Sequence, residues 1–316
     1  MKAKSSVHRV LAGVSAGALA AIFAGQAMAE ELLGQPTPGA IDLQPAASPL
    51  KHDAIFFHNA ILLPIISVIS LFVMGLLIWV IVRYNKRANP TPARWSHNTP
   101  IEVLWTVVPV LILMVIAIFS FKLLYAYHDM PKPYMTVKAT GYQWYWGYEY
   151  PDQKIDEITS NVLTPEEVAA KGLPSSLNNL AASEAMVVPV NQVVRVQVTG
   201  ADVIHAFALP AFGLKIDAIP GRLNETWFKA EKVGTYYGQC SELCGINHAF
   251  MPIEIKVVSQ PEFDAWVATK APPPAPAAPA PAAAVPAAPA TAAPAPTTPA
   301  AAPAPAAPAP APKTAA

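Results

Sequence analysis

Two long runs of uncharged, mostly apolar residues constrain this chain more than any other feature of its sequence. Residues 60–82 contain no charged side chain over 23 positions, and residues 103–121 contain none over 19. A helix of either length crosses a hydrocarbon core of about 30 Å. We therefore expect a transmembrane helical hairpin over residues 57–126, with spans at about 60–82 and 103–124, embedded in a lipid bilayer.

The short loop between the two runs is basic, which predicts its side of the membrane. Arg83, Lys86, Arg87 and Arg94 lie there, and the first acidic residue after them is Glu102. Short basic loops stay in the cytoplasm. Both ends of the chain, and everything after the second span, are then expected on the outer side.

The first 29 residues are typical of a secretory signal peptide. They carry three basic and no acidic residues, a small-residue apolar stretch, and Ala27-Met28-Ala29 at the end, which fits an A-x-A cleavage site. The alternative is a first membrane anchor. Cleavage would leave residues 30–56 as an exported N-terminal segment. The mature chain would hold 18 basic and 21 acidic residues, and this balance argues against a nucleic-acid partner.

The second apolar run is preceded by a helix-start pattern. Thr99 is predicted as the N-cap, with Pro100 at the first helical position and Glu102 at the third. Capping is one interpretation of Glu102. The other is a carboxylate at the cytoplasmic mouth of a proton path.

Residues 134–270 change to a pattern of short strands. Met135–Thr140, Val193–Thr199 and Pro252–Val258 mix β-branched and polar residues in near alternation. A domain of this length built from short strands predicts an all-β antiparallel sandwich or barrel. Two helices are also expected, one beginning at residues 164–167 and a closing one at 260–269 with Phe263 and Trp266 on its inner face.

Charge and composition separate this domain from the C-terminal residues after it. Residues 134–270 hold 10 basic and 15 acidic side chains. The acidic excess suits a basic partner, although solubility alone would also explain it. Residues 271–316 are nearly all alanine and proline, and we expect a disordered or polyproline-like tail without chemistry of its own.

The exported domain concentrates groups that bind soft metals. Both cysteines of the chain, Cys240 and Cys244, lie within 12 residues of sequence that also contain His248 and Met251. His205 stands 35 residues before Cys240, at an expected strand end. Sulfur ligands beside imidazoles select copper or zinc.

Three other interpretations compete with a copper site. The cysteines could form a disulfide, since export permits it. Two cysteines and two histidines could hold a structural zinc ion. Met251 and His205 could be core residues. A disulfide does not require the histidines, and zinc does not require a thioether. Two thiolates would allow two bridged coppers that share one electron, which suits electron relay.

Three segments carry a family resemblance: Gly238–Pro252, Asp217–Arg222 and Gly141–Trp146. Over about residues 48–270 the chain closely resembles subunit 2 of the bacterial cytochrome c oxidases. The resemblance implies a cupredoxin-like sandwich with a binuclear copper A centre, and a magnesium ion shared with oxidase subunit 1 and bound by the Glu242 carboxylate. The copper ligands that it implies are His205, Cys240, the backbone carbonyl of Glu242, Cys244, His248 and Met251.

The resemblance also assigns roles to three residues outside the ligand set. Trp144 matches the surface tryptophan through which electrons enter, although it also fits an aromatic strand face with Tyr142, Trp146, Tyr148 and Tyr150, where packing is the default explanation. Glu102 matches the carboxylate at the entrance of a proton channel and can be cap and entrance together. Asp202 matches an acidic docking residue. The family commonly has histidine where Tyr142 stands.

The resemblance implies an oxidoreductase function without an oxygen-reducing site in this chain. Cytochrome c would dock on the acidic domain and pass electrons through the copper pair to haem in subunit 1, where oxygen is reduced to water and protons are pumped. The expected location is the bacterial inner membrane, with the copper domain and both termini in the periplasm. Three alternatives are a quinol oxidase subunit, which would lack the copper ligands, a zinc or disulfide binding module, and a stand-alone copper carrier, which would not require two spans.

Overall fold

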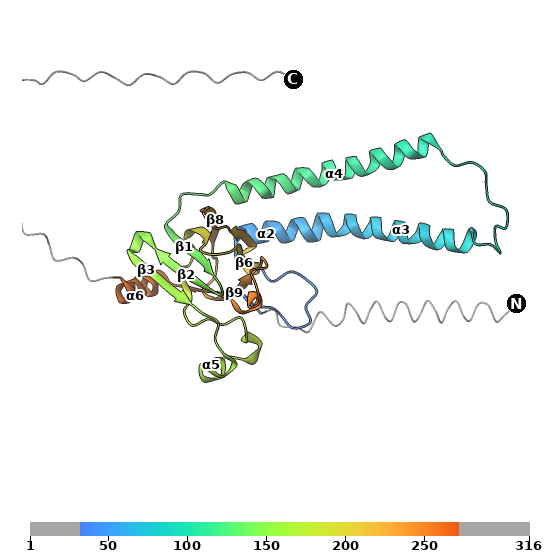
Figure 1. Cartoon of the computed structure of the whole chain (residues 1–316). Coiled ribbons are helices and arrows are strands. Elements are labelled where there is room, and N and C mark those ends of the chain that lie inside the picture. Colours follow the sequence, from blue (N-terminus) through green and yellow to red (C-terminus); the bar gives the residue numbers. More distant parts are fainter. Residues whose placement is uncertain (1–31, 272–316) are drawn as a thin grey trace, which may run out of the picture. The chain divides into compact units, whose positions relative to one another are not determined.

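The computed structural model describes residues 32–271, in which a long helical hairpin is followed by a two-sheet domain (Figure 1). The expected signal peptide and all but the first residue of the expected tail lie outside the described residues. Two apolar helices followed by a β-sandwich confirm the predicted fold class.

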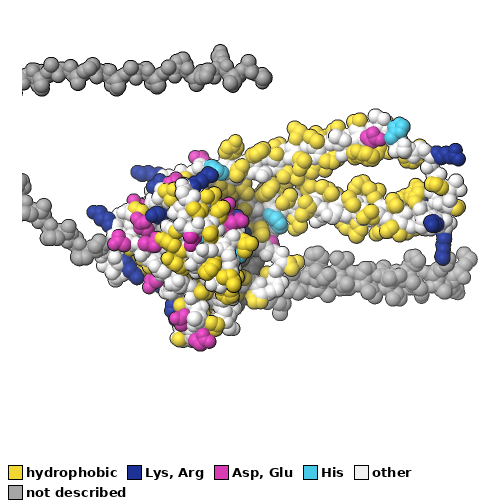
Figure 2. Space-filling view, viewed as in Figure 1, with side chains coloured by type: hydrophobic (Ala, Val, Ile, Leu, Met, Phe, Trp, Pro, Cys, Tyr) yellow, Lys and Arg dark blue, Asp and Glu magenta, His cyan; other side chains and the backbone are white. Residues whose placement is uncertain are grey.

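The first membrane helix is longer than its apolar run. α2 (Pro49–Phe56), the single π-helical turn η2 (Phe57–Leu62) and α3 (Leu63–Arg83) form one continuous helix of 35 residues. It begins at Pro49 because the Ser48 hydroxyl caps it and accepts a hydrogen bond from the Lys51 N–H. Apolar side chains cover this helix and its partner α4, and Lys and Arg side chains gather at the loop that joins them (Figure 2).

The second membrane helix, α4 (Thr99–His128), starts one residue earlier than the sequence predicts. Its N-cap is Asn98, whose side chain accepts a hydrogen bond from the Ile101 N–H at 3.3 Å, so the assignment of Thr99 as the cap was wrong. Glu102 completes the cap, because its carboxylate accepts a hydrogen bond from the Asn98 N–H at 3.1 Å. Both helices are long and apolar enough to cross a membrane.

Ten strands form two five-stranded sheets in the described domain. The first sheet has the strand order β3 (Ile155–Ser160), β2 (Tyr145–Tyr150), β1 (Met135–Tyr142), β5 (Val193–Gly200) and β8 (Asn224–Lys229). The second has the order β4 (Met186–Pro189), β10 (Pro252–Val258), β9 (Gly234–Cys240), β6 (His205–Leu209) and β7 (Leu214–Ala218).

The sheets are mixed, whereas the sequence predicted antiparallel pairing throughout. β1 pairs with β5 in parallel, and β10 pairs with β4 in parallel. The chain visits the second sheet at β4 before it returns to the first at β5, so β5 runs in the direction of β1. The remaining pairs are antiparallel, and the three strands predicted from the sequence occur within two residues of their expected bounds.

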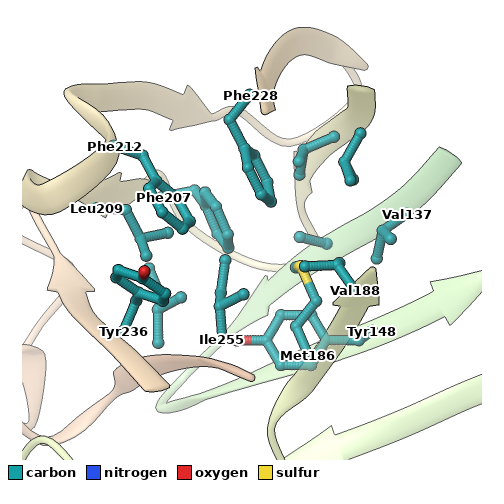
Figure 3. Close-up of a cluster of buried hydrophobic side chains, with 14 of the residues drawn as sticks. Val137, Tyr148, Met186, Val188, Phe207, Leu209, Phe212, Phe228, Tyr236 and Ile255 are labelled. Atoms are coloured by element: carbon teal, nitrogen blue, oxygen red, sulfur yellow. The ribbon is translucent and has the colours of Figure 1, made fainter. Parts of the chain in front are cut away.

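The core fills the space between the two sheets (Figure 3). Trp146, Tyr148 and Tyr150 project from one face of β2 and are fully buried. Tyr142 and Trp144 do not share that face, because the chain turns between β1 and β2. The two expected helices are confirmed as α5 (Pro165–Ala170), with a capping box at Thr164, and α6 (Gln260–Lys270), which packs Phe263 and Trp266 on the core.

A segment that we call the N-terminal strap, residues 32–48, ties the first membrane helix to the sandwich. The Gly34 carbonyl accepts a hydrogen bond from the Tyr237 N–H at 2.7 Å, and the Ala47 N–H donates to the Ala211 carbonyl at 2.9 Å. The Ser48 hydroxyl donates to the Phe212 carbonyl at 2.8 Å, across 164 positions of sequence. The hairpin is therefore fastened to the sandwich before its first span as well as after its second.

Candidate metal centre

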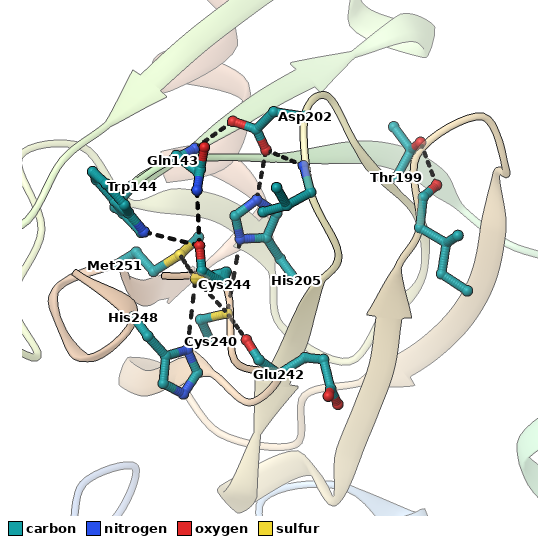
Figure 4. A network of polar contacts seen from close by, with 12 residues as sticks. Gln143, Trp144, Thr199, Asp202, His205, Cys240, Glu242, Cys244, His248 and Met251 are labelled. Carbon is teal, nitrogen blue, oxygen red and sulfur yellow. Dashed lines mark hydrogen bonds and ion pairs between the residues drawn. The ribbon is translucent and has the colours of Figure 1, made fainter. Parts of the chain in front are cut away.

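Three neighbouring strands of the second sheet bring the expected metal ligands to one edge. His205 is the first residue of β6 and Cys240 is the last residue of β9, which runs antiparallel to it. Met251 directly precedes β10, the other neighbour of β9. The connection between β9 and β10 carries Cys244 and His248, so all five side chains converge (Figure 4).

The donor atoms lie close enough to share metal ions. The Cys240 Sγ is 3.9 Å from the Cys244 Sγ and 4.0 Å from His205 Nδ1. The Cys244 Sγ is 3.6 Å from His248 Nδ1 and 3.4 Å from Met251 Sδ. The ligand atoms of His205, Cys240 and Cys244 all lie within 4.8 Å of one another. Each cysteine sulfur therefore has an imidazole and another sulfur beside it.

The two cysteines are free thiols in this structure. A disulfide bond is about 2.05 Å long, whereas the two Sγ atoms are 3.9 Å apart. The disulfide interpretation therefore does not describe the chain in this form, and both sulfurs are available to a metal.

The surroundings of the two cysteines move their pKa values in opposite directions. Burial is the largest effect on Cys240 and opposes its ionisation, but the hydrogen bonds from His205, from the backbone and from His248 together outweigh burial and lower the pKa of this thiol to about 6. Burial, and then the charge on Cys240, raise the pKa of Cys244 to about 12. A metal that binds both as thiolates must displace the second proton, so binding releases a proton.

The centre is buried except at His248. His205 is fully buried, and Cys240, Cys244 and Met251 are at most 5% exposed. The ring of His205 lies against Gly141 of β1, where a Cβ atom would come within 2.8 Å of the His205 Cδ2. Only glycine leaves room for the imidazole at that position.

Asp202 orients the buried histidine, a role that the sequence did not reveal. The Asp202 carboxylate lies 2.9 Å from His205 Nε2, and it also accepts hydrogen bonds from the N–H groups of Val203 and Gln143. A carboxylate on the far nitrogen of a metal-binding histidine fixes the ring and its tautomer. The position of Asp202, three residues before an expected metal-binding histidine, is the signal in the sequence that could have suggested this orienting role.

Trp144 contacts the ligand loop through its indole nitrogen. The Trp144 Nε1–H donates to the Cys244 carbonyl at 3.2 Å, and the side chain of Gln143 donates to the same oxygen at 2.9 Å. The sequence placed Trp144 near the centre by resemblance, but nothing in it singled out Gln143.

The two remaining site residues lie differently. The Glu242 carbonyl is 3.3 Å from the Cys240 Sγ, within the cluster, whereas its carboxylate points outward to within 3.7 Å of Lys215 Nζ. Glu102 is in the first turn of α4, at the opposite end of this helix from the sandwich, and about 39 Å of helix separates it from His128. The structure therefore does not bring Glu102 to the metal centre.

The donor set fits copper. Two thiols, two imidazoles, a thioether and a carbonyl converge here, and soft sulfur ligands favour Cu(I) over harder cations. Four of these ligands would also satisfy zinc, which is usually four-coordinate in structural sites. The buried thioether at 3.4 Å from a thiol is the feature that zinc does not require.

Two protein-family models cover most of the described chain. The model "Cytochrome C oxidase subunit II, periplasmic domain" matches residues 135–258, and "Cytochrome C oxidase subunit II, transmembrane domain" matches residues 36–123. The chain belongs to the cytochrome c oxidase subunit II family. Both the hairpin and the cupredoxin-like sandwich of this family are therefore present.

Individual relatives agree with the family models. Cytochrome c oxidase subunit 2 of Cereibacter sphaeroides is 46% identical over 267 residues, which cover 80% of this chain and 88% of the relative. A probable cytochrome c oxidase subunit 2 of Rickettsia conorii is 49% identical, over 75% of this chain and 73% of the relative. The solved periplasmic domain of subunit II of cytochrome oxidase from Bradyrhizobium japonicum is 60% identical, over 45% of this chain and 96% of that one, with a TM-score of 0.41.

Membership in the subunit II family fixes the general nature of the protein. The chain is a membrane protein with two spans and a subunit of an oxidoreductase complex, which implies other oxidase subunits as partners. The family implies copper A, and the group of His205, Cys240 and Cys244 is compatible with it.

Proposed function

We propose that this chain accepts electrons from cytochrome c and delivers them to haem in the catalytic subunit of a cytochrome c oxidase. The observation that carries the proposal is the convergence of two free thiols, 3.9 Å apart, with an imidazole beside each. When bound here, two copper ions would supply one-electron redox chemistry with the charge shared between both metals.

The proposed ligands would bind the metal pair through three kinds of group: thiolates, imidazoles and weaker ligands. Cys240 and Cys244 would hold the ions as thiolates, and His205 and His248 would bind through Nδ1, the nitrogen that faces a cysteine sulfur. Met251 and the Glu242 carbonyl would be the weak ligands. β6 and β9 fix His205 and Cys240, the β9–β10 connection carries the other proposed ligands, and a largely buried site keeps rearrangement small when the charge changes.

We propose that Trp144 receives the electron from the donor. Its indole is only partly buried, and its N–H bonds directly to the backbone of the ligand Cys244. The bond supports a short route from the protein surface to a ligand sulfur. The indole ring would lie between the donor and the buried centre.

The Glu242 carboxylate would bind a magnesium ion, at a site separate from the copper pair and at the boundary with the catalytic subunit. Its carboxylate is about half exposed and faces Lys215 at 3.7 Å, a long contact that a magnesium ion and its ligands could replace. The oxygen ligands of a carboxylate suit this hard cation. The remaining magnesium ligands would come from the catalytic subunit.

The acidic outer domain supports a basic electron donor. The 15 acidic and 10 basic residues of positions 134–270 give it a net charge near −5. Docking of cytochrome c on this side also requires the expected orientation, in which residues 1–29 are removed and the basic loop faces the cytoplasm. The docking role of Asp202 stays a prediction; its hydrogen bonds support a second role in orienting His205.

The test is a copper count and an EPR spectrum on the full chain, purified in detergent and loaded with copper. Two coppers per chain with one unpaired electron delocalised over both are expected. Cys244→Ser should abolish or convert that signal, and the matched control Ser241→Ala, beside the other cysteine, should keep it. One localised copper, or zinc alone, would refute the copper-pair assignment and favour a structural metal.

A further inference from the structure

We propose that Gln143 is a positioning residue for electron transfer, which clamps Trp144 to the ligand loop. The inference rests on the proposed function of Trp144 and assigns a determinant of its rate. Gln143 is the residue immediately before Trp144, in the turn between β1 and β2.

Gln143 is tied to both sides of the metal centre. Its backbone N–H donates to Asp202 Oδ2 at 2.8 Å, and the other oxygen of that carboxylate holds His205. Its side-chain Nε2 donates to the Cys244 carbonyl at 2.9 Å. One residue thus connects the turn that carries Trp144 to a ligand on β6 and to a ligand in the β9–β10 loop (Figure 4).

The Cys244 carbonyl accepts two hydrogen bonds from the turn. A carbonyl oxygen has two lone pairs, and here one receives the Gln143 amide and the other the Trp144 indole N–H, at 2.9 and 3.2 Å. The indole bond is the longer one. The Gln143 bond holds the Cys244 carbonyl within hydrogen-bonding distance of the indole N–H.

Gly245 makes the close approach possible. Its φ of +125° is in a region that favours glycine, and a Cβ atom there would lie 3.0 Å from Trp144 Cζ2 and 3.2 Å from Gln143 Nε2. The side chains of Gln143 and Trp144 therefore pack directly against the backbone of Gly245. This packing leaves the indole little freedom while both hydrogen bonds hold.

The clamp matters because electron transfer depends on contact at the time of the encounter. Donor binding brings haem to the surface of Trp144, but the electron advances only when the indole also contacts the Cys244 backbone. Without the Gln143 amide, the indole bond would be left to join Trp144 to the Cys244 carbonyl, because the backbone bond from Gln143 to Asp202 ties the turn to the segment before β6 and not to the β9–β10 loop. The indole should then leave the carbonyl more often.

The experiment uses the complete oxidase complex and a photo-triggered, ruthenium-labelled cytochrome c as donor. Gln143→Ala keeps the backbone N–H bond to Asp202 and removes only the side-chain bond. We expect electron transfer within the bound complex to slow by roughly two- to fivefold, the effect of losing one neutral hydrogen bond. The donor dissociation constant and the copper EPR spectrum should not change.

A double-mutant cycle tests whether Gln143 acts through Trp144. Trp144→Phe should slow the same step more strongly, and adding Gln143→Ala to it should cause no further loss. Gln197→Ala, which removes a side-chain amide bonded to Glu225 elsewhere on the domain, is the matched control and should be silent.

Each other outcome would overturn the inference in a recognisable way. Equal slowing in the presence and absence of Trp144, a loss of donor affinity at an unchanged transfer rate, or an unchanged rate in Gln143→Ala would each refute the positioning role alone. An unchanged rate in Trp144→Phe would refute the proposed role of Trp144 and the clamp with it.

Discussion

Backbone hydrogen bonds that do not depend on a metal fix the end of β9 at Cys240. The Cys240 N–H donates to the Met251 carbonyl at 3.3 Å, and the Ser241 N–H donates to the Ala206 carbonyl at 3.1 Å. These bonds join β9 to the segments on either side of it at the point where the ligands emerge. The ligand set is therefore largely formed by the sandwich itself, which reduces the ordering that metal binding must supply.

The orienting role of Asp202 predicts an effect on copper as well as on docking. Asp202→Ala removes the acceptor that fixes His205, and we expect copper affinity to fall by about 10- to 100-fold. Competition with a copper chelator measures the loss. Asp156→Ala, which removes an exposed carboxylate of β3, controls for charge and should leave copper affinity unchanged. Equal behaviour of the two variants would show that Asp202 acts through surface charge alone.

The Glu242 carbonyl was implied only by the family resemblance. The sequence predicted the other proposed ligands from residue type, with Cys240, Cys244, His248 and Met251 in one short segment and His205 35 residues before Cys240. It did not predict the partners of these ligands. Gln143 lies 101 positions before Cys244 and 59 before Asp202, and contacts over such distances depend on strand order. The aromatic alternation around Trp144 was also misleading, because a turn interrupts what resembled one continuous strand.

At the scale of elements, the Glu102 carboxylate at the start of α4 has two candidate roles, helix capping and proton acceptance. Glu102 accepts the Asn98 N–H at the helix start, next to the basic loop. The same group is partly exposed at the end of a membrane helix, where a proton path could begin. A residue that caps a helix in this way has a fixed position, and a fixed position is also what a proton acceptor requires.

The substitution Glu102→Gln separates the capping role from the proton-accepting role. The amide oxygen can still accept the Asn98 hydrogen bond, so the helix start should survive while the proton-accepting group is lost. We expect slower oxidase turnover with unchanged reduction of copper by cytochrome c, measured by oxygen uptake and stopped-flow absorbance. Asn98→Ala, which weakens the cap by about 1 kcal/mol but keeps the carboxylate, is the control. Normal turnover in Glu102→Gln would leave capping as its only role.

The elements themselves followed closely from local sequence signals. The strand bounds came from alternation, and the capping box at Thr164 and the closing helix came from local side-chain chemistry. The parallel pairing of β1 with β5 could not be predicted this way, because it depends on where the intervening chain goes. The cap at Asn98 was missed because asparagine and threonine both cap helices and stand side by side.

On the scale of the whole molecule, the charged residues are divided by sign between two parts of the chain. The loop between the membrane helices is basic, and the domain beyond the second helix has a net charge near −5. The acidic domain should attract a basic donor before any contact forms. Attraction of this kind acts on the association rate more than on the bound complex.

The association rate of cytochrome c should therefore fall as salt is added. Going from about 0.01 M to about 0.15 M ionic strength shortens the screening length from about 30 Å to about 8 Å. We expect the rate to drop by roughly tenfold or more, measured by stopped-flow reduction of the copper centre. A donor with acetylated lysines should show little dependence. An equal rate at both salt concentrations with native donor would contradict electrostatic docking.

The N-terminal strap has a consequence for how the protein is made. Its partners at residues 211–237 are synthesised long after it, when both membrane helices have already left the ribosome. The strap is thus made before the segments that it binds, and its hydrogen bonds to residues 211–237 form only after those segments have been synthesised. Correct assembly of the sandwich becomes the event that fixes the strap end of the first membrane helix, so an error in the sandwich would also leave that end of the helix unanchored.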